Sequence, residues 1–380
     1  MNTNASRRLC KMKILHLIYD DIRNPWLGGG GAFQTFTVNK SLVKRGHKVT
    51  VVTGNYPAAQ KEEEIDGVIY KRTGCGRNYL LSRMTYSLTV WRFLKGLDYD
   101  ILVDDFSAFS PTFSPLLTRK PVIAVIRSIF AIYPSRKYKL LSVGSWLLKR
   151  LGVNLYQNFL TNSAYMAERI REATSKKKIA VIPDSIDEAL FFLEGREDNF
   201  IFFLGRIDIH QKGLDTLLEA FKIVRKQREV ELIIGGGGKD VDKLRDMVAR
   251  LGLTGSVRLE GRVYGQRKEE LLQNCLFVVM PSRFESFGDV AVEAAACAKP
   301  IIGTRIPGLS ETIKDEDTGI LVEVGEPEEL SEAMIRLLDD RVLREKLGKT
   351  GRNLAKNFSA DDSSKVFEEF YLQCLNAHNR

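Results

Sequence analysis

Short apolar runs alternate with helix-length amphipathic segments along the whole chain. In its first half the apolar runs cover 13–19, 49–53, 101–103 and 122–126. In its second half they cover 200–204, 230–234, 257–259, 276–280 and 300–302. Short apolar strands that alternate with helices are typical of a doubly wound parallel sheet covered by helices on both faces. The pattern therefore predicts two α/β units in tandem.

A polar stretch separates the two series of strands. It runs from Ile182 to Asp187 and is followed by the charged residues 194–198. The 380 residues suit two domains better than one. In open α/β sheets, ligands bind beyond the carboxyl ends of the strands, so we expect two domains that face a cleft. The predicted parts are a disordered extension over 1–12, Rossmann-like domains over 13–190 and 191–358, and a C-terminal helix over 359–380.

Cysteine and histidine usage argues against a zinc site. The five cysteines form no CxxC pair, and the four histidines show no metal-ligand spacing. Scattered cysteines are typical of reduced thiols in the cytoplasm. The apolar runs, such as 122–126, fall far short of the about 20 residues that a membrane-spanning helix needs. We therefore expect a cytoplasmic location, with the inner face of the membrane as the alternative.

The net charge of +9 is spread unevenly along the chain. Residues 1–190 hold 29 Lys and Arg against 15 Asp and Glu, a net charge of +14, and the remainder has a net charge of −5. Such an asymmetry indicates that the N-terminal half faces something anionic. No zinc-finger or RRM pattern supports nucleic acid as a partner. A membrane surface or an anionic acceptor fits the charge better.

One N-terminal segment bears on the membrane hypothesis. Residues 106–167 contain no Asp or Glu, and the leucines within 139–151 fall on one face of a helical wheel. Such a helix can lie on an anionic membrane. It can equally bury its leucines in the core of its own domain, because this segment must supply part of that core. Both interpretations stay open, the second slightly favoured.

Two carboxylates follow the apolar run 276–280. Glu285 and Glu293 lie eight positions apart, and between them Ser286-Phe287-Gly288 opens an alanine-rich helix. A helix that begins after a parallel strand offers free backbone N–H groups to an anion. The carboxylates fit either an acid/base pair or acceptors for the hydroxyl groups of a sugar and a ribose. A nucleotide sugar has both a diphosphate and hydroxyl groups.

Cations follow another strand of the second series. Gly205-Arg206 and Lys212-Gly213 flank the loop after 200–204. A leaving diphosphate gains charge as its bond to a sugar breaks, so fixed cations beside it lower the barrier. Taken alone, the two cations are more often solvated surface groups. Beside the two carboxylates, a diphosphate site is the better interpretation.

Glycine-rich loops and one acidic pair remain open to two interpretations each. Gly28–Gly31 and Gly235–Gly238 either let the backbone approach a ligand closely or form a flexible loop and a tight turn. Gly28–Gly31 does not match G-x-G-x-x-G. Asp104-Asp105 resembles a metal-binding pair, but with no further acids nearby a structural role is preferred.

Together these motifs resemble glycosyltransferase family 4, whose members have the GT-B fold. The resemblance covers nearly the whole chain and is strongest over 200–325. The residues that carry it are Gly205-Arg206, Lys212-Gly213, the Glu285 and Glu293 pair within PSRFESFG, Pro300 to Ile302, and Thr318 to Val322. It implies transfer of a hexose-type sugar from a nucleotide sugar to a glycan, lipid-linked or other acceptor, with retention of configuration and without metal or cofactor. It also implies that the last helix crosses back onto the N-terminal domain.

The resemblance assigns a role to each motif residue. Arg206 and Lys212 would hold the donor diphosphate, and Glu285 the sugar hydroxyls, which makes these three the catalytic set. The donor would further be bound by Glu293 at the ribose, by backbone of Val263 at the base, by backbone of Ser286, Phe287 and Gly288, and by Gly29 and Gly30 from the N-terminal domain.

The chain departs from the family pattern at two places. Ser286 stands where the family usually has glycine, so it is a candidate determinant of donor choice. Arg127-Ser128 stands where a histidine near the acceptor is common, so we assign both residues to the acceptor side and expect an anionic or unusual acceptor. The alternatives are a nucleotide-sugar epimerase or phosphorylase on the same fold, or a non-catalytic binding protein. The intact set of Arg206, Lys212, Glu285 and Glu293 argues against the last.

Overall fold

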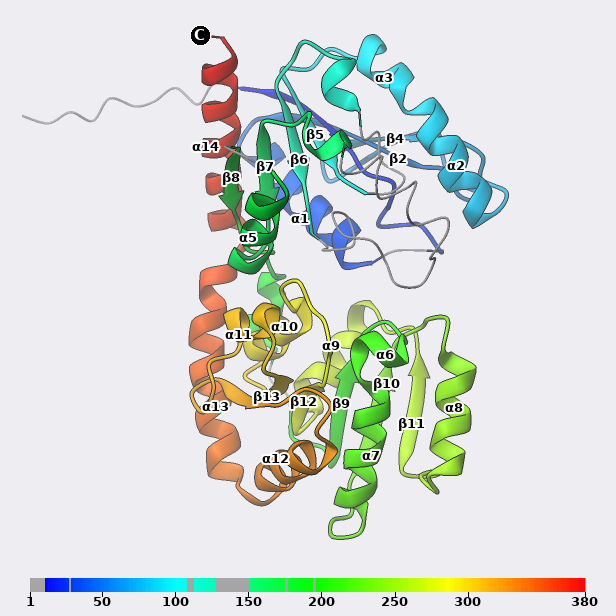
Figure 1. The fold of residues 1–380 in the computed structure, drawn as a ribbon, viewed down its shortest axis with the longest axis vertical. Coiled ribbons are helices and arrows are strands. Elements are labelled where there is room, and N and C mark those ends of the chain that lie inside the picture. The colour runs from blue at the N-terminus through cyan, green and yellow to red at the C-terminus, as the bar shows by residue number, and fades with distance from the viewer. Residues whose placement is uncertain are drawn as a thin grey trace, which may run out of the picture. The chain divides into compact units, whose positions relative to one another are not determined.

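The computed structural model describes residues 11–26, 29–107, 113–127, 151–174, 177–193 and 196–379. It contains two compact units, Met1–Ser185 with Ala360–Arg380 and Ile186–Ser359. Each unit is an α/β layer structure built on its own sheet (Figure 1). Gly28, Ser128 and nearly all of the predicted helix over 139–151 lie outside the described residues. Within the described ranges, no helix is long and apolar enough to cross a membrane.

The N-terminal unit contains an eight-stranded sheet in the order β3-β4-β2-β1-β5-β6-β7-β8. All neighbouring strands are parallel except β3 and β4. Its strands are β1 (Lys13–Leu17), β2 (Lys48–Gly54), β3 (Glu62–Ile65), β4 (Val68–Thr73), β5 (Ile101–Asp105), β6 (Val122–Val125), β7 (Asn158–Thr161) and β8 (Lys178–Val181). Its helices are α1 (Gly30–Lys44), α2 (Tyr79–Thr89), α3 (Trp91–Gly96), α5 (Ala164–Ala173) and α14 (Ala360–His378), with a 3₁₀ turn at Ser114–Leu116.

The hairpin of β3 and β4 was not predicted from the apolar runs. Asp66 and Gly67 join its strands, and both have positive φ, 49° and 83°. Two consecutive residues of this kind form the type I′ turn that two-residue hairpins favour. The strand β3 reads Glu-Glu-Glu-Ile and is exposed or half-buried, so it carries no apolar signal. The edge of the sheet is thus antiparallel in an otherwise parallel unit.

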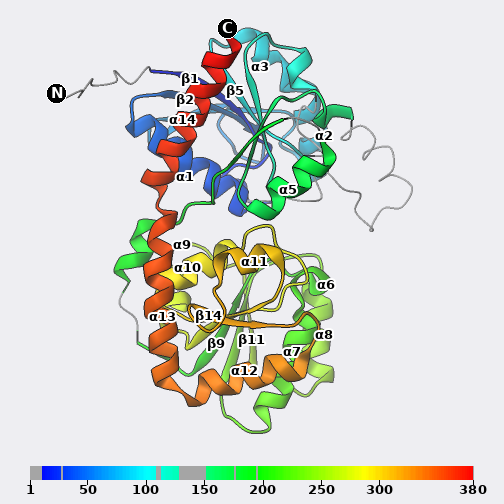
Figure 2. The same ribbon diagram turned by 60° about the vertical axis from the view of Figure 1, so that its left-hand side comes forward.

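The last helix packs on the N-terminal unit, as the resemblance implied. In α14, Phe367, Phe370 and Tyr371 are buried in one cluster with residues of β1, β2 and α1, and α14 lies beside α1 (Figure 2). The buried Glu368 accepts a 2.7 Å hydrogen bond from Arg45 Nε. A buried carboxylate needs such a partner, so this contact fixes the register of the helix.

The C-terminal unit contains a six-stranded, all-parallel sheet in the order β11-β10-β9-β12-β13-β14. Its strands are β9 (Phe200–Leu204), β10 (Glu231–Gly235), β11 (Val257–Gly261), β12 (Phe277–Met280), β13 (Ile301–Thr304) and β14 (Gly319–Val322). Its helices are α6 (Ile209–Lys212), α7 (Leu214–Arg225), α8 (Val241–Arg250), α9 (Gly265–Asn274), α10 (Asp289–Ala296), α11 (Pro307–Thr312), α12 (Pro327–Asp339) and α13 (Arg341–Ala355), with 3₁₀ turns at Glu188–Phe192 and Lys356–Phe358.

Two hydrophobic clusters cover the two faces of this second sheet. One cluster joins the sheet to α7, α8 and α12, and the other joins it to α9, α10 and α11. The four residues of β12 and of β13 are all buried, as expected for strands with helices on both sides. The doubly wound parallel sheets predicted from the apolar runs are therefore confirmed.

Candidate functional site

The strand order of the C-terminal unit reverses between β9 and β12. Strands β10 and β11 extend the sheet on one side of β9, and β13 and β14 extend it beyond β12. Ligands of open α/β sheets bind at such a switch point, beyond the carboxyl ends of the strands. The loops that leave these two strands cover 205–213 and 281–288, and they contain the predicted Arg206, Lys212 and Glu285.

An ion pair joins these two loops. Lys212 Nζ donates to Glu285 Oε1, and Ser282 Oγ donates to the same oxygen at 2.9 Å. The two charged side chains are only 14% and 12% exposed. The structure thus brings together one cation and one carboxylate that the sequence placed in separate motifs. Ser282, which orients the carboxylate, was not singled out by the sequence.

Arg206 stands apart from this pair. Its residue is exposed, and its side chain makes no hydrogen bond or ion pair with the residues that the structure describes. The backbone beneath it is well held, because Gly205 N donates to Gly235 O and Ile207 N donates to Gly237 O, each at 3.0 Å. The glycine loop after β10 therefore supports the Arg206 loop. This contact favours a tight structural turn for Gly235–Gly238.

Two glycines bring the loops of the site into contact. Gly213 has a φ of +63°, and a Cβ there would lie 1.9 Å from Pro281 O. A Cβ on Gly308, at the start of α11, would lie 2.3 Å from Glu285 O. Only glycine permits such close approach of backbone to backbone. Two carbonyls of the second loop are thus each packed against a glycine: Pro281 O against Gly213, and Glu285 O against Gly308.

Glu293, on the helix α10 that follows the second loop, has a partner of its own. It is 8% exposed on α10, and Lys268 Nζ of α9 donates to its Oε1 at 2.6 Å. The sequence indicated that a solvated carboxylate was an unlikely account of Glu293, and its burial agrees. It did not identify Lys268, because a buried carboxylate calls for a cation without indicating which of the 57 Lys and Arg residues supplies it.

The side chains of Phe287 and Val263 belong to the core. They are 3% and 5% exposed, and the Phe287 ring packs edge-on against Phe358 with centroids 5.6 Å apart. Gly288 has a φ of +93° and caps the N-terminus of α10. These residues can meet a ligand through backbone groups, which is the role that the resemblance gave them. Ser286 is half-buried beside them.

In the N-terminal unit, the strand order reverses between β1 and β5. The loop after β1 leads to Gly29, which caps α1, and Ala32 N and Phe33 N donate to Gly29 O at 3.1 and 3.2 Å. A Cβ on Gly29 would meet nothing within 4 Å. Gly29 and Gly30 thus open a helix at the carboxyl edge of the sheet, where an anion would meet free N–H groups.

Arg127 at the end of β6 is held by two carboxylates. Its Nη1 donates to Asp105, and its Nε lies 3.6 Å from Asp184 Oδ1. The charge of Arg127 is therefore already balanced, and this residue alone gives no ground for an anionic acceptor. The neighbouring Asp104 accepts hydrogen bonds from Tyr156 and Ser114, each at 2.5 Å. The structural interpretation of Asp104-Asp105 agrees with these contacts.

Burial of His16 makes the stability of the N-terminal unit depend on pH. Asn39 Nδ2 lies 3.2 Å from His16 Nδ1, so Nδ1 accepts this hydrogen bond and the neutral ring carries its proton on Nε2. Burial, and secondly the charge of Arg127, lower the pKa of His16 from 6.5 to about 3. Between these values the unfolded chain binds a proton that the folded chain does not, so stability falls as the pH falls.

Because of the lowered pKa of His16, we expect the free energy of unfolding to drop by about 2 kcal/mol between pH 6.5 and 5, at about 1.4 kcal/mol per pH unit. A His16→Gln variant should lack this part of the loss. The measurement is urea denaturation of both proteins at pH 7 and pH 5, followed by a probe in the N-terminal unit. An identical pH dependence in the two proteins would contradict the assignment.

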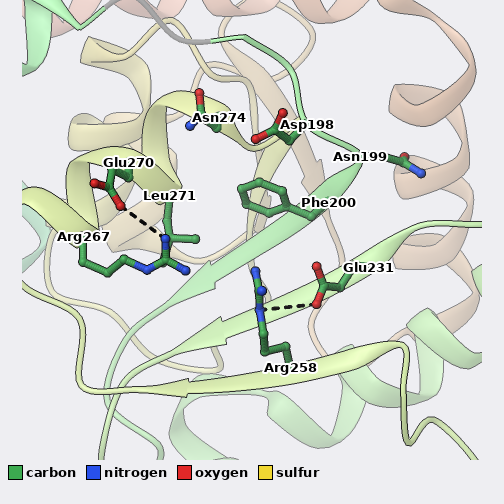
Figure 3. A pocket seen from close by; sticks show the side chains of 9 residues that line it. All are labelled: Asp198, Asn199, Phe200, Glu231, Arg258, Arg267, Glu270, Leu271 and Asn274. Atoms are coloured by element: carbon green, nitrogen blue, oxygen red, sulfur yellow. Dashed lines mark hydrogen bonds and ion pairs between the residues drawn. The ribbon is translucent and has the colours of Figure 1, made fainter.

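Two cavities of the C-terminal unit lie at the opposite edge of its sheet. One of about 370 Å³ is lined at the amino ends of β9, β10 and β11 by Phe200, Glu231 and Arg258. Figure 3 shows its ion pairs, Arg258 with Glu231 and Arg267 with Glu270. The other, of about 890 Å³, is lined by residues that precede β9, β12 and β13. Neither cavity touches the switch point, so neither is the candidate site.

Two family models match consecutive parts of the chain. The model described as glycosyl transferases group 1 matches residues 187–354, and the model described as glycosyltransferase family 4 matches residues 28–190. Together the two matches include Gly29, Gly30, Arg127 and both loops at the switch point of the C-terminal unit, whereas β1 precedes the first match.

Two curated relatives come from Methanocaldococcus jannaschii. The uncharacterized glycosyltransferase MJ1178 is 34% identical over 211 residues, which are 54% of this chain and only 58% of that protein. The uncharacterized glycosyltransferase MJ1607 is 26% identical over 372 residues, which are 91% of this chain and 95% of that protein. The chain thus spans little more than half of the first relative and nearly all of the second.

Solved structures agree on the fold. A sucrose-phosphate synthase from Thermosynechococcus elongatus matches with a TM-score of 0.81 at 19% identity, covering 97% of this chain and 100% of that one. Anabaena HepE in complex with UDP-glucose matches with a TM-score of 0.73 at 18% identity, covering 94% and 98%. At these identities the similarity concerns the fold, which is GT-B.

Proposed function

Because this chain belongs to glycosyltransferase family 4, we propose that it binds a nucleotide sugar at the switch point between β9 and β12 and transfers the sugar with retention of configuration. The observation that carries the proposal is the ion pair of Lys212 with Glu285. It brings an ammonium and a carboxylate side by side in a backbone frame held by glycine contacts, which supports a diphosphate site next to a site for sugar hydroxyls.

The pair suggests how the donor is received. An arriving diphosphate competes with Glu285 for Lys212, since phosphate oxygens accept charge-assisted hydrogen bonds from an ammonium. Glu285 Oε1 then keeps its bond from Ser282 and gains an acceptor site for a sugar hydroxyl. The exposed Arg206 offers a planar fork to the same diphosphate. As the bond to the sugar breaks, charge grows on the diphosphate, and fixed cations stabilise it most at that stage.

We propose that this positive charge makes a metal ion unnecessary and that the leaving phosphate accepts the proton of the acceptor hydroxyl. Transfer should then continue in EDTA at an unchanged rate, and NMR of the product should show the anomeric configuration of the donor. A product of inverted configuration, or a rate that EDTA abolishes and Mg²⁺ restores, would contradict these two points separately. Incubation of the donor without acceptor tests the epimerase alternative, because only an epimerase releases an altered nucleotide sugar.

The donor base is proposed to be uracil. HepE, a neighbour in fold, was solved with UDP-glucose, and the buried Val263 leaves the base to be met by backbone. A thermal-shift panel with UDP, GDP and ADP and their glucose derivatives tests this. A ligand at one hundred times its Kd stabilises the unit that binds it by about 2.7 kcal/mol. A rise in melting temperature with GDP or ADP but not with UDP would contradict uracil as the donor base. No rise with any of these ligands would contradict the proposed donor site.

Glu293 is proposed to bind the ribose of the donor. A Glu293→Gln variant should bind UDP about tenfold more weakly, as expected when a hydrogen bond to a charged group loses about 1.5 kcal/mol, whereas kcat at saturating donor should change little. Glu219→Gln, at an exposed position of α7, is the matched control. Calorimetric titration with UDP measures the affinity. If the Glu293 variant bound UDP with unchanged affinity, Glu293 would not be the residue that binds the ribose.

The acceptor is proposed to be a glycan or a lipid-linked sugar used on the cytoplasmic side of a membrane. The net charge of +14 over residues 1–190 supports an anionic surface nearby. Transfer assays with soluble glycans and with lipid-linked sugars in vesicles distinguish the two acceptor classes.

A further inference from the structure

An apolar helix face of the N-terminal unit points outward. On α2, Leu80, Met84 and Leu88 are 63%, 55% and 75% exposed. They are spaced by four residues, so they form one stripe along the helix. The opposite face is the one that attaches α2, since Tyr86 is fully buried and donates to Val52 O at 3.2 Å. The stripe is therefore not part of the core of this unit among the described residues.

The charged residues in the sequence segment that contains this stripe all have one sign. Residues 67–97, which include α2 and α3, contain six Lys and Arg and no Asp or Glu. Three of these cations are exposed, namely Arg77 just before α2 and Arg92 and Lys95 on α3. Arg77 precedes the N-cap of α2 by one residue, and Arg92 and Lys95 lie on the helix that follows it. The apolar stripe is thus flanked by cations at both ends.

We propose that α2 and α3 dock the protein on an anionic lipid surface, with Leu80, Met84 and Leu88 inserted among the acyl chains. An apolar helix face edged by Lys and Arg binds membranes by apolar burial together with attraction to anionic headgroups. The absence of any acidic residue over 67–97 favours this occupant, because a protein partner would ordinarily be met by charges of both signs. The inference does not rest on glycosyl transfer, since docking needs neither donor nor acceptor.

The experiment is co-sedimentation of the full-length protein with vesicles of phosphatidylcholine alone and with 30% phosphatidylglycerol. We expect binding to the anionic vesicles only. Leu88→Glu combined with Met84→Glu should weaken it by at least about tenfold, because charged groups replace the inserted side chains. Val342→Glu, at a position that is 77% exposed on α13, controls for an added charge and should bind like the parent.

The cations have a separate expected effect. Each of Arg77→Gln and Lys95→Gln should weaken binding about fivefold, which corresponds to about 1 kcal/mol per cation near an anionic surface. The weakening should shrink as salt is raised from 0.05 to 0.5 M, because ions screen exposed charges. A core substitution that lowers stability as much as Arg77→Gln or Lys95→Gln should not weaken vesicle binding. If it weakens binding equally, the effect of the two variants is not due to their lost charge.

Three results would overturn the proposal. The first is binding that does not differ between the Leu88 and Met84 double variant and the Val342 variant. The second is a melting temperature that falls in the double variant but not in the control, which would mean that the chain itself covers the stripe. The third is a dimer in gel filtration that the double variant converts to a monomer, which would identify a second copy as the occupant.

Discussion

Replacement of Lys212 by methionine is expected to lower kcat for sugar transfer by about 10²- to 10³-fold, the usual cost of removing one donor that stabilises charge in a transition state. Lys212 reaches the switch point between β9 and β12, and its side chain is 14% exposed there beside Glu285. Methionine keeps the length and apolar contacts of the side chain and removes only the charge. Initial rates at saturating donor and acceptor measure the effect.

Lys222→Met is the matched control, because Lys222 is exposed on α7, the helix that follows the same loop. The control should keep the rate of the parent. Glu285→Gln together with Lys212→Met should cost little more than Lys212→Met alone, since residues that act as a unit are not additive. A Lys212 variant with more than a tenth of the parental kcat would show that its charge is not used in the transition state.

Replacement of Arg72 by methionine is expected to destabilise the N-terminal unit by about 3–5 kcal/mol, because it leaves a buried carboxylate without its cation. Arg72 Nε donates to Asp21 Oδ2 at 2.8 Å, and neither side chain is exposed. Thr53 Oγ1 donates to the same oxygen at 2.9 Å. Asp21 lies in the loop that leads from β1 to Gly29 and Gly30, so the variant should also loosen that loop.

Lys71→Met in the same strand is the control. Lys71 pairs with Glu62, whose side chain is 60% exposed, and a pair of this kind contributes at most about 1 kcal/mol. Adding Asp21→Leu to Arg72→Met should restore much of the loss, since an apolar pair replaces a lone buried charge. The measurement is hydrogen exchange of β1 and β4, which isolates this unit from the other. Equal destabilisation by the two single variants would contradict the assignment.

Local patterns were sufficient for the strands and the loops that end them. The apolar runs that became β9 and β12 are fully or nearly buried, and the glycine, cation and carboxylate motifs follow directly after such runs. Both signals lie within a few consecutive residues, so a reader of the sequence can detect them. The exception is β3, whose polar strand and Asp66-Gly67 turn lack the apolar signal.

Partners of individual side chains could not be predicted in the same way. The resemblance placed Arg127 on the acceptor side, and the structure adds its partners, Asp105 and Asp184, which the sequence did not indicate. The apolar sequence around Glu293 indicated that its carboxylate is not merely solvated, but only the structure shows that Lys268 is its cation. These pairs depend on which helices and strand ends become neighbours in the folded unit. The local sequence around each residue does not contain that information.

The sequence by itself determined that this protein has two α/β units with largely parallel sheets, and that glycines, cations and carboxylates follow the ends of strands in the second unit. Strand periodicity and loop composition are local properties, so they survive without coordinates. Only the tertiary structure decided that Lys212 and Glu285, 73 residues apart, form one pair, and that Asp21 and Arg72 anchor the loop before α1. The reason is the order of strands in each sheet, which places β9 beside β12 and is set by packing of the whole unit.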